Sequence, residues 1–293
     1  MKMLGRAVAV MLTAVTLGSG DARAQTIRDS DGSWNARISE EGEGRLHIRV
    51  SRWDQDSRWE SDLSLDPETG RRVLGQLPDG EGDVRFTVER EAGVLTFEGN
   101  FRRGRGMGEF AFTENEGFRD TMRQLGYGRL DSDEVFSAAL LDVGQQLARE
   151  MDRIGFRELD FDELVTASIF DINAEYVREM RDAGLGDLDF DEYVSSRVFD
   201  IDAAFVAEAR HLGLGPLDHD DLVAMKVHGL DRDFMESLRD VDINLRDFDD
   251  ALAFRIHGIT AEWIRELQDE GFEDLTTDDL MKIRIHGLDD IMR

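Results

Sequence analysis

The chain has 293 residues, a formal net charge of −29 and no cysteine. A chain without cysteine has neither a disulfide framework nor a thiol nucleophile. The acid is concentrated in one part, since residues 1–114 hold 16 Lys/Arg and 20 Asp/Glu whereas residues 115–293 hold 19 and 44. So negative a field disfavours nucleic acid and anionic lipid surfaces, and it favours a protein partner with a basic surface.

Residues 1–24 have the pattern of a secretory signal peptide. A basic start precedes an apolar run from Ala7 to Leu17, and Ala22-Arg23-Ala24 before Gln25 matches the small-x-small cleavage pattern. The apolar run is too short to span a bilayer, and no later stretch approaches about 20 apolar residues. The sequence therefore predicts an exported protein, periplasmic or extracellular, with no transmembrane segment after signal cleavage.

Residues 26–113 predict a small antiparallel β domain, either a sheet or a sandwich. Apolar and polar residues alternate with period two in short segments, and turn signals stand at 67–70, 78–80 and 91–93. About 90 residues are enough for such a domain. The predicted strands cover 34–39, 45–52, 59–65, 83–90, 93–101 and 107–112.

Residues 115–288 form six windows of 29 residues that align without insertion or deletion. Five of the six windows carry a glycine at the same position, and the fifth window carries Asp242 there instead. A fixed period in this range indicates stacked units, each of which buries an apolar face on its neighbours. The windows are 115–143, 144–172, 173–201, 202–230, 231–259 and 260–288, and a tail covers 289–293. The recurring glycines are Gly126, Gly155, Gly184, Gly213 and Gly271.

Each window predicts two short helices. In the third window Asn173 is the N-cap of the first helix, and Gly184 ends it in a left-handed conformation. Asp189 then begins the second helix, with Glu192 placed for a capping box. The exits of the second helices are residue types that tolerate positive φ; these are Asp171, Asp200, Gly229, Gly258 and Gly287. Apolar columns on the second helices predict their core side, and one column comprises Ile169, Val198, Val227, Ile256 and Ile285.

The predicted fold class is thus α+β multidomain: a small antiparallel β domain followed by an α-solenoid of six helix-turn-helix repeats. The fifth window departs from the pattern, because Asp242 replaces the glycine and Arg246 replaces a linker leucine. Two interpretations stay open, namely drift in a tolerant array and a hinge near residue 243.

Three recurring sets of side chains were weighed as sites. Neighbouring repeats would hold His228, His257 and His286 roughly 9–10 Å apart, too far to share one metal ion. We therefore predict no metal site. If a metal does bind, these three histidines are the candidate ligands. A second set consists of aspartates at the starts of the second helices, where negative charge is favoured. These segments lack the glycine-bearing loop of a calcium site, and calcium binding between repeats is the alternative. The set comprises Asp133, Asp162, Asp191, Asp220, Asp249 and Asp278.

The third set is basic and lies near the C-terminal ends of four second helices. Positive charge there complements the helix dipole. The alternative interpretation is that the row of basic residues binds an acidic chain. The set comprises Arg197, Lys226, Arg255 and Arg284.

No catalytic motif is found. The chain contains neither His-Glu-x-x-His, nor Gly-x-Ser-x-Gly, nor a phosphate-binding loop, and residues 104–108 are no dinucleotide fingerprint. We therefore predict a protein that is not an enzyme and that uses no cofactor.

The repeats resemble a known family. Arg255 to Ile264 (Arg-Ile-His-Gly-Ile-Thr-Ala-Glu-Trp-Ile) and Arg284 to Leu288 carry the likeness best, which covers roughly residues 110–288. They are similar to the repeated extracytoplasmic tail of sensor-type membrane metallopeptidases of the beta-lactamase regulator kind, and to stand-alone secreted bacterial proteins of unassigned role. The transmembrane helices and zinc motif of those peptidases are missing here, so the resemblance implies an exported bacterial interaction or sensing module without peptidase activity.

The predicted function is a protein-binding or envelope-sensing scaffold that uses an acidic solenoid surface. The alternative is a carbohydrate- or peptide-binding protein with its site on the β domain, and an envelope hydrolase comes third. The residues expected to meet a partner are Phe161, Phe190 and Phe248, with Asp162, Asp191 and Asp220 and the four basic residues of the third set.

Overall fold

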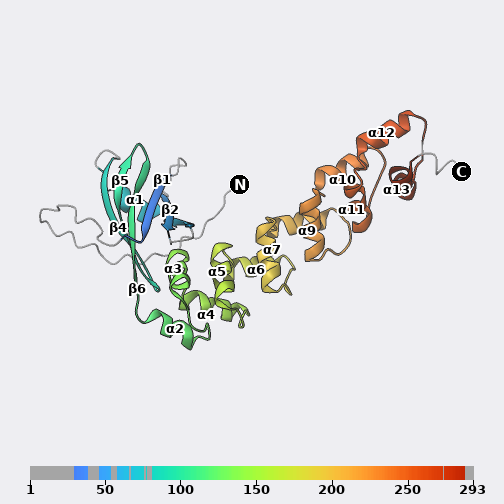
Figure 1. The fold of residues 1–293 in the computed structure, drawn as a ribbon. Coiled ribbons are helices and arrows are strands. Elements are labelled where there is room, and N and C mark those ends of the chain that lie inside the picture. The colour runs from blue at the N-terminus through green and yellow to red at the C-terminus, as the bar shows by residue number, and fades with distance from the viewer. Residues whose placement is uncertain are drawn as a thin grey trace, which may run out of the picture. The chain divides into compact units, whose positions relative to one another are not determined.

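The computed structural model describes residues 30–38, 46–53, 58–65, 67–75, 77, 81–272 and 274–287. Within them, an antiparallel sheet is followed by a succession of short helices (Figure 1), which confirms the α+β class. The chain divides into two compact units, unit 1 ending at Ile169 and unit 2 beginning at Phe170. The predicted signal peptide, the turn at 78–80 and the tail at 289–293 lie outside the described residues.

The sheet has six strands in the order β3-β2-β1-β6-β5-β4, and every neighbouring pair is antiparallel. The first and last strands of the domain therefore pair in the middle, where Trp34 lies opposite Gly108. The six segments predicted from alternation correspond to these strands. Their bounds are β1 (Gly32–Ile38), β2 (Leu46–Trp53), β3 (Arg58–Leu65), β4 (Gly82–Arg90), β5 (Gly93–Arg102) and β6 (Arg105–Glu114).

One face of the sheet carries the aromatic core. The Trp34 ring lies 6.0 Å from Phe86 and 5.8 Å from Phe101, centroid to centroid. Gly106 leaves room for these rings, because a Cβ there would lie 2.5 Å from Phe101 and 2.7 Å from Trp34. The indole Nε1 of Trp34 donates a hydrogen bond of 3.1 Å to the Glu98 carbonyl, so burial of the ring leaves no polar atom unsatisfied.

A helix, α1 (Pro67–Leu74), stands where the sequence predicted a turn at 67–70. Proline at the first helical position is compatible with a helix because its missing N–H has no partner there in any case. The Arg72 guanidinium then pairs with Glu68 one turn earlier at 2.7 Å, and Val73 is buried. The turn prediction was wrong because proline and glycine were read as breakers while the tertiary contact with the sheet was unknown.

The helices of unit 1 are joined closely to the sheet. Arg119 pairs with Glu114 at the end of β6, and the Glu91 carboxylate accepts hydrogen bonds from the backbone N–H of Gln145 at 3.0 Å and Gln146 at 3.3 Å. The domain boundary predicted near residue 114 therefore does not coincide with the division at Ile169. The bounds are α2 (Phe118–Gln124), α3 (Ser132–Leu141), α4 (Gln145–Ile154) and α5 (Phe161–Ile169).

Unit 2 consists of helices in pairs. The second helices of successive pairs pack on one another, since α7 contacts α9 and α9 contacts α11. The bounds are α6 (Ala174–Asp182), α7 (Phe190–Val198), α8 (Ala203–His211), α9 (His219–His228), α10 (Arg232–Arg239), α11 (Phe248–Ile256), α12 (Ala261–Asp269) and α13 (Thr277–His286).

The predicted helix ends are confirmed by the backbone. Gly184 and Gly213 have φ of 91° and 77°, and Asp242 occupies the equivalent place with φ of 62°. Asp171 and Asp200 leave their helices with φ of 51° and 54°. At the starts, Asp189, Asp218 and Thr276 each form a reciprocal capping box. These local interactions fix where each short helix begins and ends.

Candidate functional site

The apolar column predicted for the core lies on the surface. On α9, Leu222 and Met225 are buried, but Val227 projects about 160° away from Met225 around the helix axis at 3.6 residues per turn. The prediction was wrong because the second helices are apolar on more than one side. The exposed fractions are 57% for Ile169, 54% for Val198, 56% for Val227, 55% for Ile256 and 49% for Ile285.

Each exposed residue belongs to a larger surface motif. One turn earlier on α7, Val194 is half-buried, and Asp191 is exposed a further three residues back. Residues spaced three and four apart share one side of a helix. The three side chains therefore form a strip that consists of one acidic residue followed by two aliphatic residues. We call the strips of unit 2 together the outer stripe; its members are Asp191, Val194 and Val198, Asp220, Val223 and Val227, Asp249, Leu252 and Ile256, and Asp278, Met281 and Ile285.

The acids of neighbouring helices influence one another. Partial burial raises the pKa of Asp221, and the carboxylates of Asp218 and Asp249 raise it further. Burial likewise raises the pKa of Asp250, with further increases from Asp247, Asp278 and Asp249. Two stripe members, Asp249 and Asp278, therefore influence an acid at the start of the preceding second helix. None of these acids converges with others on a metal ion, because the described residues contain no group of three or more His, Cys, Asp or Glu that could hold one.

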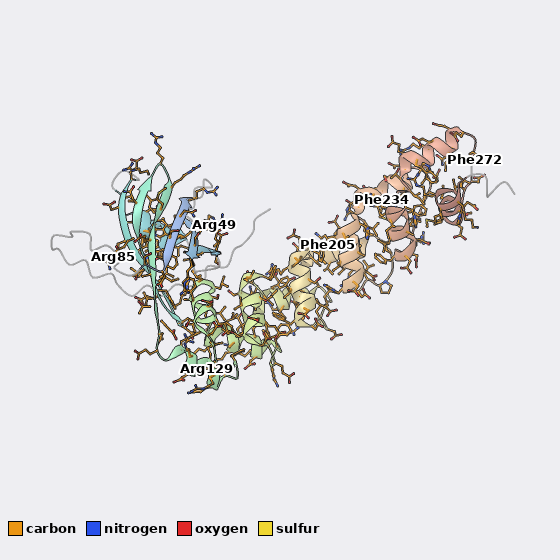
Figure 2. The ribbon with its side chains drawn as sticks, in the orientation of Figure 1. Arg49, Arg85, Arg129, Phe205, Phe234 and Phe272 are labelled. Carbon is orange, nitrogen blue, oxygen red and sulfur yellow. The ribbon has the colours of Figure 1, made fainter. Side chains whose placement is uncertain are left out.

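The basic set is engaged within unit 2 rather than free for an acidic chain. Arg255 Nε donates to the His228 carbonyl at 2.9 Å, and Arg284 Nε donates to the His257 carbonyl at 2.8 Å. Each cation of the basic set also lies over an aromatic ring of a first helix. Two of these rings, Phe205 and Phe234, are labelled in Figure 2. Their distances to the ring centroids are 3.6 Å for Arg197 over Tyr176, 4.0 Å for Lys226 over Phe205, 4.7 Å for Arg255 over Phe234 and 5.1 Å for Arg284 over Trp263.

The three histidines are exposed at the ends of their helices. Two of them, His228 and His257, contribute backbone carbonyls to the arginine bonds, and His286 is the last residue of α13. Their recurrence is accounted for by helix ends without any ligand, since an imidazole beside the negative end of a helix is favoured.

The phenylalanines expected to meet a partner divide into two groups. Phe161 and Phe190 are buried at the first positions of α5 and α7, whereas Phe248 is only half-buried. The two buried rings belong to the core and are not accessible to a partner. Of the accessible residues, the sequence analysis included Asp191 and Asp220 but assigned the exposed apolar residues to the core, although their 29-residue spacing was visible in the sequence.

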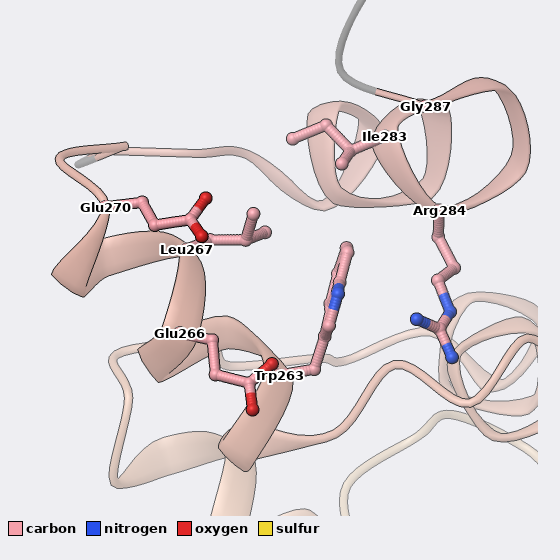
Figure 3. A pocket seen from close by; sticks show the side chains of 7 residues that line it. All are labelled: Trp263, Glu266, Leu267, Glu270, Ile283, Arg284 and Gly287. Atoms are coloured by element: carbon pink, nitrogen blue, oxygen red, sulfur yellow. The ribbon is translucent and has the colours of Figure 1, made fainter.

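Two hollows open on unit 2. One, of about 310 Å³, lies between α12 and α13, with Trp263 and Arg284 on its walls and Glu266 and Glu270 at its rim (Figure 3). The other, of about 720 Å³, lies between α6 and α8 and is lined by Glu179, Asp182, Asp202, Arg210, His211 and small alanines. The side chains around both offer charge and apolar surface but no hydroxyl or thiol nucleophile.

Comparisons with models of known protein families, with curated proteins and with solved structures found no match. No helix among the described residues is long and apolar enough to cross a membrane.

Proposed function

We propose that the protein is an exported, non-enzymatic scaffold in which six repeats stack as an α-solenoid and bind a protein partner with a basic surface. The observation that supports this most is the outer stripe. Five of the eight large apolar side chains that are exposed among the described residues occupy one repeat position, and four of these five belong to the outer stripe. An apolar contact repeated at a fixed interval beside aspartates is typical of a binding surface, whereas scattered exposed residues need no explanation.

The acidic field supports a basic partner. A net charge of −25 over residues 115–293 increases the association rate of a positively charged protein, and salt screens that attraction. The sensing role implied by the resemblance to the sensor-peptidase tail is part of the same proposal, because binding of a partner is the step that such a module would report.

Affinity capture from a cell-envelope extract tests the proposal. The full chain is the bait, and a poly-glutamate resin of equal bound charge is the control for acidity alone. We expect proteins with basic surfaces to be retained on the chain at about 0.05 M salt and reduced at about 0.5 M, where the Debye length is much shorter. The proposal fails if nothing is enriched over the poly-glutamate control.

A further inference from the structure

In the first repeat, the residues equivalent to the outer stripe are buried by other parts of the same chain. On α3, Phe136 and Leu140 occupy the places of Val194 and Val198, and they are only 3% and 2% exposed. The Phe136 ring stacks on Phe110 of β6 at 5.8 Å, with an angle of 10° between the rings. It also lies 5.4 Å from Phe112. The face of α3 is therefore packed against the sheet of the same unit, which α3 contacts through β3, β5 and β6.

A basic residue completes this contact. Arg52 of β2 lies over the Phe136 ring, with its guanidinium carbon 5.3 Å from the centroid, and its Nη1 is 3.4 Å from Asp133 Oδ1. Asp133 stands at the place of Asp191 in the outer stripe. In the first repeat, the acid and the first apolar residue of the strip thus have partners of matching chemistry, and the second apolar residue, Leu140, is buried.

Unit 1 contains two copies of the strip of one acidic and two apolar residues, and the last apolar residue is buried on α3 but exposed on α5. The helix α5 packs beside α3, yet Ile169 at the place of Leu140 is 57% exposed. The two helices have the same position in the repeat, and α3 packs against the sheet through β3, β5 and β6.

We propose that the outer stripe of unit 2 is a docking surface for a protein that presents aromatic side chains with an arginine beside them, as β6 and β2 do on α3. The inference rests on the proposed function and names the chemistry of its partner. The aromatic rings cover the aliphatic pair of each strip, and the arginine meets the aspartate at its edge. The four strips of unit 2 offer four such contacts at a regular interval.

A second copy of the chain does not fit the stripe as well. The sheet face that carries Phe110 and Phe112 is occupied by α3 of its own chain, so it is not free to cover another molecule. Two outer stripes face to face would bring the aspartates of both together, and like charges in contact oppose association.

The test uses a short cyclic β-hairpin peptide with phenylalanines on one face and an arginine beside each, labelled for fluorescence anisotropy with the full chain. In a second peptide glutamates replace the arginines, and in a third serines replace the phenylalanines. We expect only the first peptide to bind, and the variant Val198→Ser/Val227→Ser should weaken it by about tenfold because apolar contact area is lost. The variant Asp191→Asn/Asp220→Asn should weaken it several-fold at about 0.05 M salt and less at about 0.5 M.

Matched controls change the same chemistry elsewhere. Met107→Ser removes an exposed apolar side chain from the sheet, and Asp187→Asn/Asp240→Asn removes two exposed charges outside the stripe. Neither control should change the affinity. Circular dichroism of each variant establishes that it is folded, as is expected because every substituted side chain is exposed.

Three results would overturn the inference: equal binding of all three peptides, an equal loss in the controls and the stripe variants, or no binding of the first peptide. A dimer in sedimentation that Val198→Ser/Val227→Ser dissociates would assign the stripe to a second copy instead. Tighter peptide binding after removal of residues 1–24 would assign it to the chain's own terminus. If envelope proteins are still captured when the peptide test fails, the scaffold function stands and only the surface is wrong.

Discussion

The His219 imidazole occupies a place that holds phenylalanine in the second, third and fifth repeats. It is 6% exposed, and neither ring nitrogen has a hydrogen-bond partner in the part of the chain that the structure describes, although Asp220 Oδ1 lies 3.6 Å from Nδ1. A buried polar group without a hydrogen bond costs roughly 1–3 kcal/mol. The residue therefore reduces stability at a position where neighbouring repeats gain from an apolar ring.

Replacing this imidazole should stabilise the protein. We expect His219→Phe to raise the free energy of unfolding by about 1 kcal/mol, because the polar atoms disappear and a ring fills the same space. Thermal unfolding followed by circular dichroism measures the change, with Phe190→His as the reverse substitution that should lower the melting temperature. A lower melting temperature for His219→Phe would mean that the imidazole has a partner that compensates for its burial.

The glycine at 184 is favoured by its backbone, and the flexible end of the Arg210 side chain lies beside it. Its φ is 91°, and an added Cβ would lie 2.6 Å from the guanidinium nitrogens of Arg210. We expect Gly184→Val to lower the free energy of unfolding by about 1–3 kcal/mol, since a β-branched residue is strained at positive φ. Gly184→Asn should cost less, as Asp242 already adopts this conformation in the fifth repeat. Ser195→Ala, at a half-buried polar position, is the control; similar losses for Ser195→Ala and Gly184→Val in urea unfolding would contradict the assignment.

Among the elements, the second helices begin with side chains that cap them, and acids at the starts of α9, α11 and α13 also raise one another's pKa. Capping boxes at Asp189, Asp218 and Thr276 stabilise the starts. The raised pKa values of Asp221 and Asp250 show that partial burial and neighbouring carboxylates disfavour their charged forms. The helix starts therefore combine local stabilisation with a repulsion between repeats that a basic partner would relieve.

The pH dependence follows from the direction of these shifts. Because the pKa of Asp250 is higher in the folded chain than its ordinary value of 3.8, its stabilising effect is present below pH 3.8 and is lost as the pH rises through the folded pKa. We expect Asp250→Asn to raise stability at pH 7 by a few tenths of a kcal/mol, as for exposed charge pairs. The gain should shrink near pH 3 and at about 1 M salt. Melting temperatures at both pH values measure it, and a gain that is independent of pH would exclude repulsion as its cause.

On the largest scale, the sheet caps the start of a helix within unit 1. The Glu91 carboxylate, in the turn between β4 and β5, accepts bonds from the N-terminus of α4, whose N-cap residue Gly144 supplies no side-chain bond. A Cβ on Gly144 would lie 2.8 Å from the Glu91 carboxyl carbon, so the glycine permits this approach. The sheet and the first repeats are consequently one unit.

Removal of this cap should affect both parts of unit 1. We expect Glu91→Ala to lower the free energy of unfolding by about 1 kcal/mol, the usual cost of a lost N-cap. It should also speed proteolysis near Gly144, while Glu109→Ala on the exposed side of β6 should do neither. If Glu91→Ala leaves both the urea midpoint and the cleavage pattern unchanged, the sheet and the array are not coupled through this residue.

Features that depend on residues a few positions apart could be predicted from the amino-acid pattern. The six strands follow from alternation, and helix starts and ends follow from caps such as Asp189 and from Gly184, whose interactions are local. The buried side of each second helix could not be predicted in this way, because α9 carries apolar groups around much of its surface, at Leu222, Val223, Met225 and Val227, and periodicity cannot choose between them. The same holds for α1 and for the division at Ile169, since burial is set by contacts between segments far apart in the chain: Leu140, on the helix that packs against the sheet, is buried, and Ile169 is exposed.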